Sequence, residues 1–396
     1  MKQLKQEKTD SSISLFLRFL KFGFLAWGGP VAQIATVKQE LVEEEKWISR
    51  EKFNRVLSIY QVLPGPEAHE LCVYFGMLRH GRWGGFLAGL GFMLPGFLLM
   101  LLFSWLYVQF GLHSPMVAGL FLGCQPAVVA LIVRAIHRLG EHAFSDRWLI
   151  GISGAVFIAA ICKLSFALSL SLGGLAYFLK QKKGAAAIAS LPLIVMVILG
   201  VAFFFYGRSA TEGIIERGYN LHSPSLLALF GYGLRTGLLT FGGAYTAISF
   251  LQKDAVLVGQ WMTNAQFLDG IALSGILPAP LIIFATFVGY LGMGIFGGIV
   301  MTAGIFLPAF SFSLIGHKYI EKTVENRRIH SFLDGVMAGV VGIISATAVE
   351  LMRSTLVSSI SIILFALSLF ILYYWRSKVT VVFVILGAAI MGLLLR

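Results

Sequence analysis

The chain alternates between long apolar runs and short clusters of polar and charged residues. About 20 helical residues cross the hydrocarbon core of a bilayer, so apolar runs of this length are typical of transmembrane helices. We therefore predict an all-α polytopic membrane protein with about 13 transmembrane spans. The expected spans are 13–37, 53–78, 83–110, 115–133, 148–162, 164–179, 185–206, 225–250, 266–291, 294–316, 332–349, 356–375 and 379–395. The pair within 148–179 requires a turn at Lys163.

Composition agrees with this reading, because 57% of the 396 residues are hydrophobic and only 13% are charged. Soluble domains carry about 25% charged residues, so a soluble enzyme and a disordered chain are both excluded. The three cysteines, Cys72, Cys124 and Cys162, are scattered through apolar spans. This spacing supports neither a disulfide framework nor a zinc site, and no metal is expected.

The net charge of +12 comes from basic clusters between the apolar runs. Such clusters are orientation signals in membrane proteins, so the charge does not indicate a nucleic acid partner. With the N-terminus in the cytoplasm, basic residues inside outnumber those outside by roughly two to one. We therefore predict a multi-pass protein of the cytoplasmic membrane with its N-terminus inside and its C-terminus outside. This topology places the acidic loop that contains Glu40 and Glu45 outside.

The sequence matches itself at an offset of 214 residues, which falls to 213 after one deletion. The matched pairs are Gly23 and Gly237, Gly28 and Gly242, Gly29 and Gly243, Trp47 and Trp261, Phe53 and Phe267, Pro64 and Pro278, Pro66 and Pro280, Gly76 and Gly289, Gly81 and Gly294, Gly91 and Gly304, and Pro95 and Pro308. The chain is therefore expected to divide into an N-terminal repeat at 1–184, a linking span and loop at 185–224 and a C-terminal repeat at 225–396.

The linking span determines how the repeats are oriented. Six expected spans and this one additional span separate equivalent points, and an odd number of crossings turns the second copy over. The halves are thus expected to be inverted repeats, as in many secondary transporters. If the linking helix is a miscount, the repeats are parallel.

Each repeat interrupts its first two spans at matching places. Proline lacks an N–H, and two prolines separated by one residue do not fit a regular helix. A broken helix within a membrane lines a cavity or lies buried in protein, and its free N-terminus attracts anions. The candidate substrate-binding residues at these breaks are Gly28, Gly29, Pro64, Gly65, Pro66, Gly242, Gly243, Pro278 and Pro280. The alternative is that these residues only kink the helices.

Two cations, Lys21 and Arg235, each stand seven residues before a glycine pair. A cation inside an apolar span is costly and is often functional, so both are candidate ligands for an anionic substrate. The alternative is that they extend to the lipid headgroups.

Only the first repeat follows its Pro-x-Pro break with ionisable residues, namely Glu67, His69 and Glu70. Carboxylates and histidine in a membrane cavity can carry protons, so all three are coupling candidates. Glu67 could equally cap the free N–H groups of its own helix.

Two helix starts are also readable from the sequence. Ser49 and Thr263 are expected N-cap residues, and Thr263 with Gln266 fits a capping box. The sequence shows no nucleotide-binding loop, nucleophile elbow or zinc-protease motif. We therefore expect no enzyme, no catalytic residues and no cofactor.

The residues at 19–97 and 231–310 resemble the chromate ion transporter family in its long, two-repeat form. The resemblance rests on Phe22 and Gly23, Gly28 to Pro30, Trp47, Gln61 to Glu67, Gly76, Gly81 and Phe92 to Pro95. It implies a cytoplasmic-membrane protein that exports chromate and gives chromate resistance, with sulfate as a competitor. The second copy departs from the pattern at Ala244 and Ala279, so its half-site can differ in role.

The leading hypothesis is therefore a secondary transporter for a tetrahedral oxyanion. A transporter or channel for another anion, such as sulfate or a small organic anion, is the alternative, and a membrane-embedded enzyme is a third. The expected partners are a chromate- or sulfate-like oxyanion and the lipid bilayer, without nucleic acid. A homodimer is compatible with the sequence.

Overall fold

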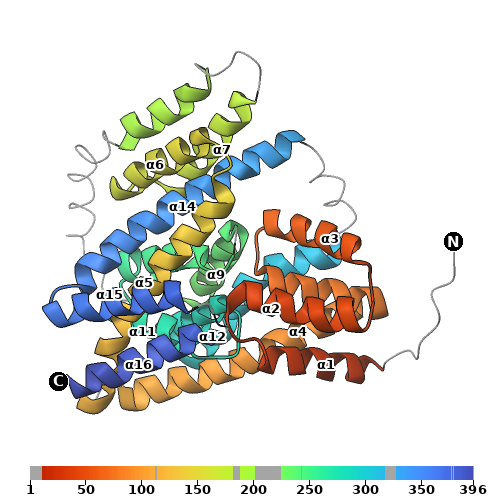
Figure 1. Ribbon diagram of the computed structural model, residues 1–396, viewed down its shortest axis with the longest axis horizontal. Helices are drawn as coiled ribbons and strands as arrows, with labels where there is room; N and C mark the ends of the chain where they lie inside the picture. The colour runs from red at the N-terminus through yellow and green to blue at the C-terminus, as the bar shows by residue number, and fades with distance from the viewer. Residues whose placement is uncertain are drawn as a thin grey trace.

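The computed structural model describes residues 11–395 apart from 112–113, 182–187, 201–223, 242, 317–326, 376 and 378. Every regular element in these residues is helical, as predicted (Figure 1). The first repeat contains α1 (Ser12–Phe24), α2 (Gly29–Lys38), η1 (Gln39–Glu44), α3 (Arg50–Val62), α4 (Glu67–Leu106), η2 (Tyr107–Gly111), α5 (Pro115–Ala143), α6 (Arg147–Ile161) and α7 (Phe166–Lys180). A helix at Ile188–Gly200 follows.

The second repeat has the same order of elements. It contains α9 (Leu226–Leu239), α10 (Thr246–Gln252), η3 (Lys253–Val258), α11 (Asn264–Gly275), η4 (Leu281–Ile283), α12 (Phe284–Ser311), η5 (Phe312–Gly316), α14 (Arg327–Thr355), α15 (Ser359–Tyr374) and α16 (Thr380–Leu394).

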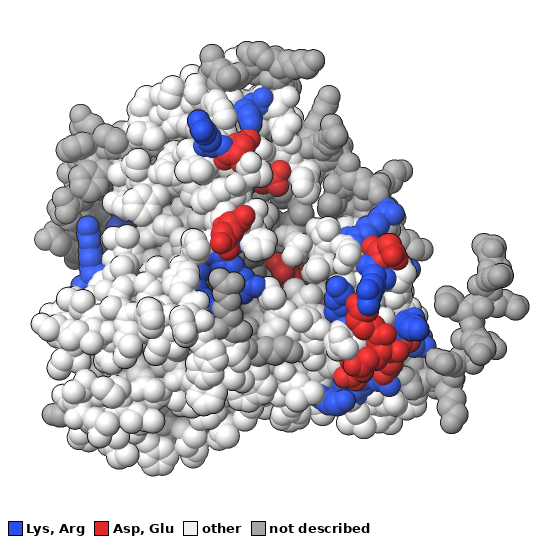
Figure 2. Space-filling view, viewed as in Figure 1, with Lys and Arg blue, Asp and Glu red and all other residues white. Residues whose placement is uncertain are grey.

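In the part of the chain that the structure describes, four helical stretches are long and apolar enough to cross a membrane, at Glu67–Gly111, Pro115–Ala143, Leu281–Gly316 and Ile329–Thr355. Six shorter apolar helices accompany them. On the face in Figure 2, charged side chains gather where α1, α2 and α3 lie, whereas the surface over α16 and the end of α4 shows none. This distribution is that of a multi-pass membrane protein.

The longest helix of each repeat is a hairpin folded at a glycine. Gly81 in α4 and Gly294 in α12 adopt φ 60° with ψ near −150°, a conformation essentially restricted to glycine. A Cβ on Gly76 would lie 2.3 Å from the carbonyl oxygen of Gly84, although eight residues of straight helix span about 12 Å. The chain therefore reverses at Gly81, and the same contact recurs between Gly289 and Gly297 in α12.

Predicted span 13–37 is not one continuous helix but a segment that folds back on itself. It consists of α1 and α2 with a break between them, and thirteen residues of α1 reach only about 20 Å. Arg18 pairs with Glu45, and the Lys21 Nζ lies 3.6 Å from the Glu40 Oε1. Both ends of the segment therefore lie at the same end of the molecule. The prediction that the Glu40–Glu45 loop lies across the membrane from Lys21 is wrong, because hydropathy does not distinguish a returning hairpin from a crossing.

The next predicted span, 53–78, also returns. The Arg79 guanidinium lies 4.0 Å from the Trp47 ring centroid, and Phe75 stacks with Phe53 at 6.4 Å. The start of α3 therefore lies beside the end of the first arm of α4. In the second repeat, the Trp261 indole N–H donates to the Val288 carbonyl at 3.2 Å, which brings the same two points together.

Glycines allow the outer helices to pack closely on these hairpins. A Cβ on Gly91 would lie 2.8 Å from the Phe16 carbonyl oxygen of α1. The matching Gly304 is equally close to Phe230 of α9. Small residues at such contacts let backbones approach where lipid supplies no hydrophobic drive.

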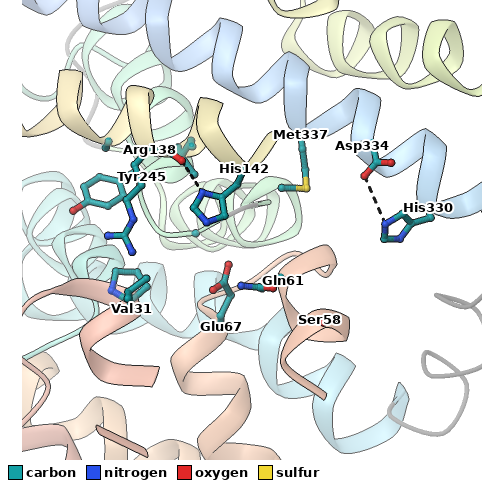
Figure 3. A pocket seen from close by; sticks show the side chains of 14 residues that line it. Val31, Ser58, Gln61, Glu67, Arg138, His142, Tyr245, His330, Asp334 and Met337 are labelled. Carbon is teal, nitrogen blue, oxygen red and sulfur yellow. Dashed lines mark hydrogen bonds and ion pairs between the residues drawn. The ribbon is translucent and has the colours of Figure 1, made fainter. Parts of the chain in front are cut away.

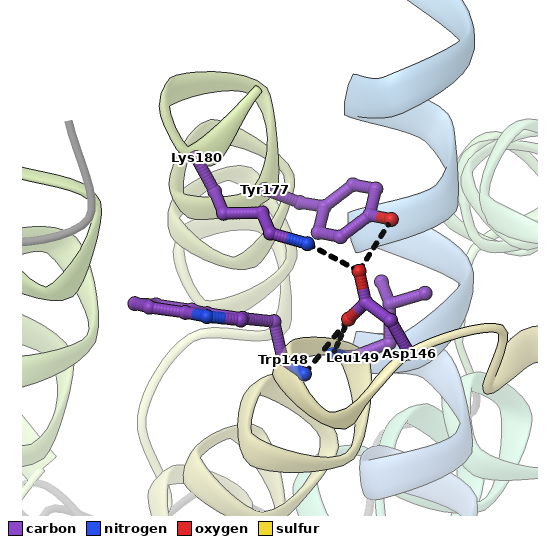
Figure 4. Close-up of polar contacts among 5 residues, drawn as sticks. All are labelled: Asp146, Trp148, Leu149, Tyr177 and Lys180. Carbon is purple, nitrogen blue, oxygen red and sulfur yellow. Dashed lines mark hydrogen bonds and ion pairs between the residues drawn. The ribbon is translucent and has the colours of Figure 1, made fainter. Parts of the chain in front are cut away.

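The turn predicted at Lys163 is present, since α6 ends at Ile161 and α7 begins at Phe166. Asp146 holds the other ends of these two helices together (Figure 4). Its carboxylate caps α6 through the Trp148 and Leu149 N–H groups and accepts bonds from Tyr177 and Lys180 of α7. The α6–α7 pair then packs against α14.

Candidate functional site

A cavity of about 360 Å³ lies between the two repeats. It is lined by Pro30, Val31, Ser58, Gln61, Glu67, Ala135, Arg138, Leu139, His142, Gly243, Tyr245, His330, Asp334 and Met337 (Figure 3). The first repeat supplies residues from its two breaks and from α3 and α5. The second repeat supplies its first break and the beginning of α14. Liquid water occupies about 30 Å³ per molecule, so the cavity has room for a small ion with several waters.

Two helix N-termini open at this cavity. Gly28 and Gly29 have φ of 86° and 78°, and they direct the chain into α2 so that Pro30 and Val31 line the wall. Pro66 precedes the first residue of α4, Glu67, which also lines the wall. The first N–H groups of a helix have no partner within it and carry partial positive charge. Both helices thus begin at the cavity wall, although Pro30 of α2 has no N–H to donate.

The breaks of the two repeats contact each other. The Gly65 N–H donates to the Thr240 carbonyl at 2.8 Å. The Gln33 side-chain amide donates to the Ala26 carbonyl at 2.9 Å and to the Ala279 carbonyl at 3.1 Å. Backbone groups left open where the helices break are thus satisfied by the opposite repeat, which explains why such breaks are tolerated within lipid.

Charged and polar side chains from three helices face the cavity. Glu67 of α4 and Gln61 of α3 point into it below His142 of α5 (Figure 3). Arg138 and Tyr245 lie together on another wall. One guanidinium, the carboxylates of Glu67 and Asp334 and several neutral polar groups thus surround the same space.

Ion pairs and hydrogen bonds hold parts of this wall. The His142 Nδ1 lies 2.8 Å from the Arg138 carbonyl oxygen one helical turn earlier. His330 and Asp334 of α14 pair at 3.8 Å at the outer end of the cavity. Arg138 has no carboxylate within ion-pair distance among the residues that the structure describes.

The predicted binding residues divide into three groups. Gly243 and Glu67 line the cavity directly. The residues Gly28, Gly29, Pro64, Gly65, Pro66, Pro278 and Pro280 shape the breaks around it without lining it. Gly242 lies outside the described residues.

Lys21 and Arg235 lie away from the cavity in matching ion pairs. Lys21 pairs with Glu40, and Arg235 pairs with Asp254 at the equivalent position of the second repeat. The Asp254 side chain is 3% exposed, so Arg235 balances a buried acid. These contacts connect α1 to η1 and α9 to η3.

The other two coupling candidates lie behind Glu67, away from the wall. Both His69 and Glu70 are fully buried. The His69 ring packs edge-on against Phe306 at 5.0 Å and Phe310 at 4.6 Å. Neither Glu70 carboxyl oxygen has a hydrogen-bond partner among the described residues. Glu70 is thus a buried acid one helical turn from the cavity.

Sequence reasoning missed Arg138, His142, Gln61 and Tyr245. Predicted span 115–133 ends at the first charge, whereas α5 continues to Ala143. Arg134, Arg138 and His142 follow one another at intervals of four residues, which places them on one helix face. This spacing could have indicated that 134–142 forms a helix with a basic face, in place of the cytoplasmic loop predicted there.

The polar groups of the cavity include donors that suit an anion. The described residues include no group of three or more His, Cys, Asp or Glu side chains that could hold a metal ion. An unpaired guanidinium beside two helix N-termini is a donor set for an oxyanion.

Comparison with known proteins gives a consistent result. A family model described as chromate transporter matches residues 13–204 and 227–393. The chain is 53% identical to a chromate transport protein of Pseudomonas aeruginosa, over 96% of this chain and 91% of the relative. It is 29% identical to a chromate transport protein of Cupriavidus metallidurans, over 96% and 92%. No solved structure matches. The two matched segments confirm the predicted two-repeat form.

Proposed function

Because the chain belongs to the chromate transporter family, we propose that it is a secondary transporter that exports chromate from the cytoplasm across the cell membrane. The observation that carries this proposal is the cavity between the repeats, where two helices begin and Arg138 has no carboxylate within ion-pair distance among the described residues. The family is one of transporters, and the absence of a reactive side-chain constellation in the sequence agrees with transport without chemistry.

Chromate binds between Arg138 and the helix N-termini in this proposal. A dianion that leaves water loses a large hydration energy, so helix dipoles of about half a charge are insufficient alone. The planar guanidinium of Arg138 can donate to two oxygens of a tetrahedral ion. Gln61 and Tyr245 add neutral donors on the same walls. The cavity thus recognises charge and tetrahedral shape, and for this reason sulfate is expected to compete.

Glu67 is proposed to couple transport to protons. It shares the cavity with Arg138, so a bound dianion repels its carboxylate and favours the protonated form. Binding of the oxyanion and of a proton are then linked, and release of one promotes release of the other. Glu70, one turn away and without a hydrogen-bond partner in the described residues, extends this path into the protein.

Inversion of the repeats is part of the same proposal. Gln61 of the first repeat lines the main cavity with Asp334 near the start of α14. Lys253 of the second repeat lines a different cavity with Arg353 near the end of α14. Inversion is proposed because an odd number of expected spans separates equivalent points of the repeats, and α14, which reaches both cavities, is long enough to cross the membrane. Alternating access would then arise from rocking of one repeat against the other.

Transport by inverted vesicles of known orientation tests the function. Arg138→Gln should raise the half-saturating chromate concentration by about 10- to 100-fold, the value of a charge-assisted hydrogen bond. Arg147→Gln removes an equally exposed cation outside the cavity and should transport normally. Normal half-saturation in Arg138→Gln would exclude this cavity as the chromate site. Glu67→Gln should flatten the pH dependence of uptake, and sulfate in excess should inhibit it.

Cysteine labelling tests the topology on a background of Cys162→Ser. Cysteines at Glu44 and Ile13 should label from the same side, and a cysteine at Val258 from the opposite side. Labelling of Glu44 and Val258 positions from one side would make the repeats parallel.

A further inference from the structure

A second cavity of about 280 Å³ lies at the other end of α14. Three separate segments build it: the turn between α6 and α7, the junction of α10 with η3, and the last turns of α14. The nearest α14 residues of the two cavities, Met337 and Ile343, are six residues apart, which is about 9 Å of helix, and the two linings share no residue. The two cavities are therefore distinct sites.

The wall of the second cavity carries an excess of positive charge. Lys163, Lys253 and Arg353 line it, together with a single carboxylate, Glu350. In the described part of the chain, none of the three cations has an acidic group within ion-pair distance. Asp254, the neighbour of Lys253, is engaged by Arg235. The positive charge of this cavity is therefore not neutralised by the surrounding described residues.

Lys163 occupies a position where the backbone favours glycine. It follows α6 with φ 63°, and its N–H donates to the Ala160 carbonyl while the Leu164 N–H donates to the Ala159 carbonyl. This is the helix-ending turn in which the left-handed residue is usually glycine. A lysine here places a cation at the cavity despite an unfavourable conformation, and strain of this kind concentrates at functional sites.

Lys253 is held in place by an aromatic ring. Its Nζ lies 4.2 Å from the centroid of Phe166, which also lines the cavity. The lysine is half-buried, so part of its hydration is already lost. A cation fixed in this way can accept an anion with little further ordering.

We propose that this second cavity binds a tetrahedral oxyanion. The ligand has two possible sources with the same chemistry. One is the transported anion itself, and for this source the inference rests on the proposed function. The other is the phosphate of an anionic lipid headgroup. Three cations converging on one cavity suit a group with two negative charges and several acceptor oxygens. As a transport site, it would gather or release the oxyanion at the face opposite the main cavity.

Binding measurements on the full-length protein test the proposal. Purified wild type in a neutral detergent should bind two sulfate or chromate ions per chain by equilibrium dialysis. The double variant Lys253→Gln with Arg353→Gln should lower the affinity for one of these ions by about 10- to 100-fold and leave the affinity for the other unchanged. Arg138→Gln should lower the affinity for the other ion only, and Arg147→Gln should change the affinity for neither.

Lys163→Gly is the variant least able to disturb folding, because glycine suits the left-handed turn. This variant should lower the affinity for the same ion by about tenfold, and its thermal stability should equal or exceed that of the wild type. Unaltered binding in both Lys163→Gly and the double variant would overturn the proposal. Lack of chromate transport by wild type, with the second ion still bound, would instead refute the proposed function alone.

Nanodiscs distinguish the two sources. If the ligand is a lipid phosphate, the wild type in nanodiscs binds one free ion. Its bound lipids are then enriched in phosphatidylglycerol over phosphatidylcholine, and the double variant loses this enrichment. If the ligand is the transported anion, the second free ion is seen in both lipids. A double variant that equals wild type in free-ion binding and in lipid enrichment contradicts both.

Discussion

The Pro-x-Pro breaks of the two repeats share a backbone plan but differ in what surrounds them. After Pro66, the first repeat continues directly into α4 with Glu67 at the cavity. After Pro280, the second repeat makes a short 3-10 turn, η4, whose residues are at most 5% exposed. The first break therefore places a helix N-terminus and a carboxylate at the cavity, and the second is packed among apolar side chains.

The ion pairs at the start of each repeat show the same contrast. The Glu40 side chain is 24% exposed beside Lys21, whereas Asp254 is 3% exposed beside Arg235. An acid that is nearly free of water depends more on its cation than an exposed one. Duplication has thus left a first copy whose Pro-x-Pro break brings a carboxylate to the cavity and a second copy whose matching break is packed in apolar surroundings.

Replacing the prolines of the two Pro-x-Pro breaks should give the largest difference between the repeats. Pro64→Ala with Pro66→Ala restores two N–H groups and lets helix form across the first break, so half-saturation for chromate should rise about 10- to 100-fold in vesicles. Pro278→Ala with Pro280→Ala changes a break that does not line the cavity, and should lower the yield of folded protein with little change in half-saturation. Equal effects on half-saturation would contradict the division of roles.

The hairpin glycines should instead behave alike. Gly81 and Gly294 have the same dihedral angles, and a Cβ on either would meet nothing within 4 Å. Alanine should therefore cost only backbone strain, about 1–3 kcal/mol of unfolding free energy at each site. Thermal unfolding in detergent measures it, with Gly151→Ala as a control in open space within α6. A large difference between the two glycines would mean that the hairpins are not equivalent.

The ion pairs should again differ, by a smaller amount. Arg235→Gln leaves the buried Asp254 without its cation and should cost about 1–3 kcal/mol of stability. Lys21→Gln should cost at most about 1 kcal/mol, because that pair is exposed. Asp254→Asn should restore most of the stability lost in Arg235→Gln. If Arg235→Gln instead changes the half-saturating chromate concentration and leaves stability unaltered, Arg235 is a candidate substrate ligand after all.

The helix caps should show the smallest difference. Ser49 accepts from the Lys52 N–H alone, whereas Thr263 and Gln266 form the reciprocal capping box predicted from the sequence. Alanine at either N-cap should cost about 1 kcal/mol, with Thr263→Ala costlier by a few tenths. Parallel melting curves of the two variants and of Gln266→Ala check this order.

Features determined by local chemistry were predictable. Proline and glycine restrict the backbone wherever they occur, so the breaks near Gly28 and Pro64 and the turn at Lys163 could be located from the sequence. The caps at Ser49 and Thr263 are equally local. Glu67 was identified because an ionisable residue directly follows a helix break.

Features that depend on long-range packing were not predictable. Hydropathy gives the length of an apolar run but not whether the chain returns to its starting side, so the pairing of Arg18 with Glu45 was missed. The end of α5 was predicted at its first charge, and Arg138 was found to line the cavity only in the structure, where residues of the opposite repeat line the same space.

The hydrogen bonds between the breaks also constrain how the protein is made. The Gly65 N–H and the Gln33 amide depend on acceptors at Thr240 and Ala279, which are synthesised long after them. A newly inserted first repeat therefore carries unmet polar groups that the bilayer interior does not tolerate. It must remain near water or the insertion machinery until its second half emerges. Maturation of the protein then includes the docking of two halves, in which each completes hydrogen bonds of the other.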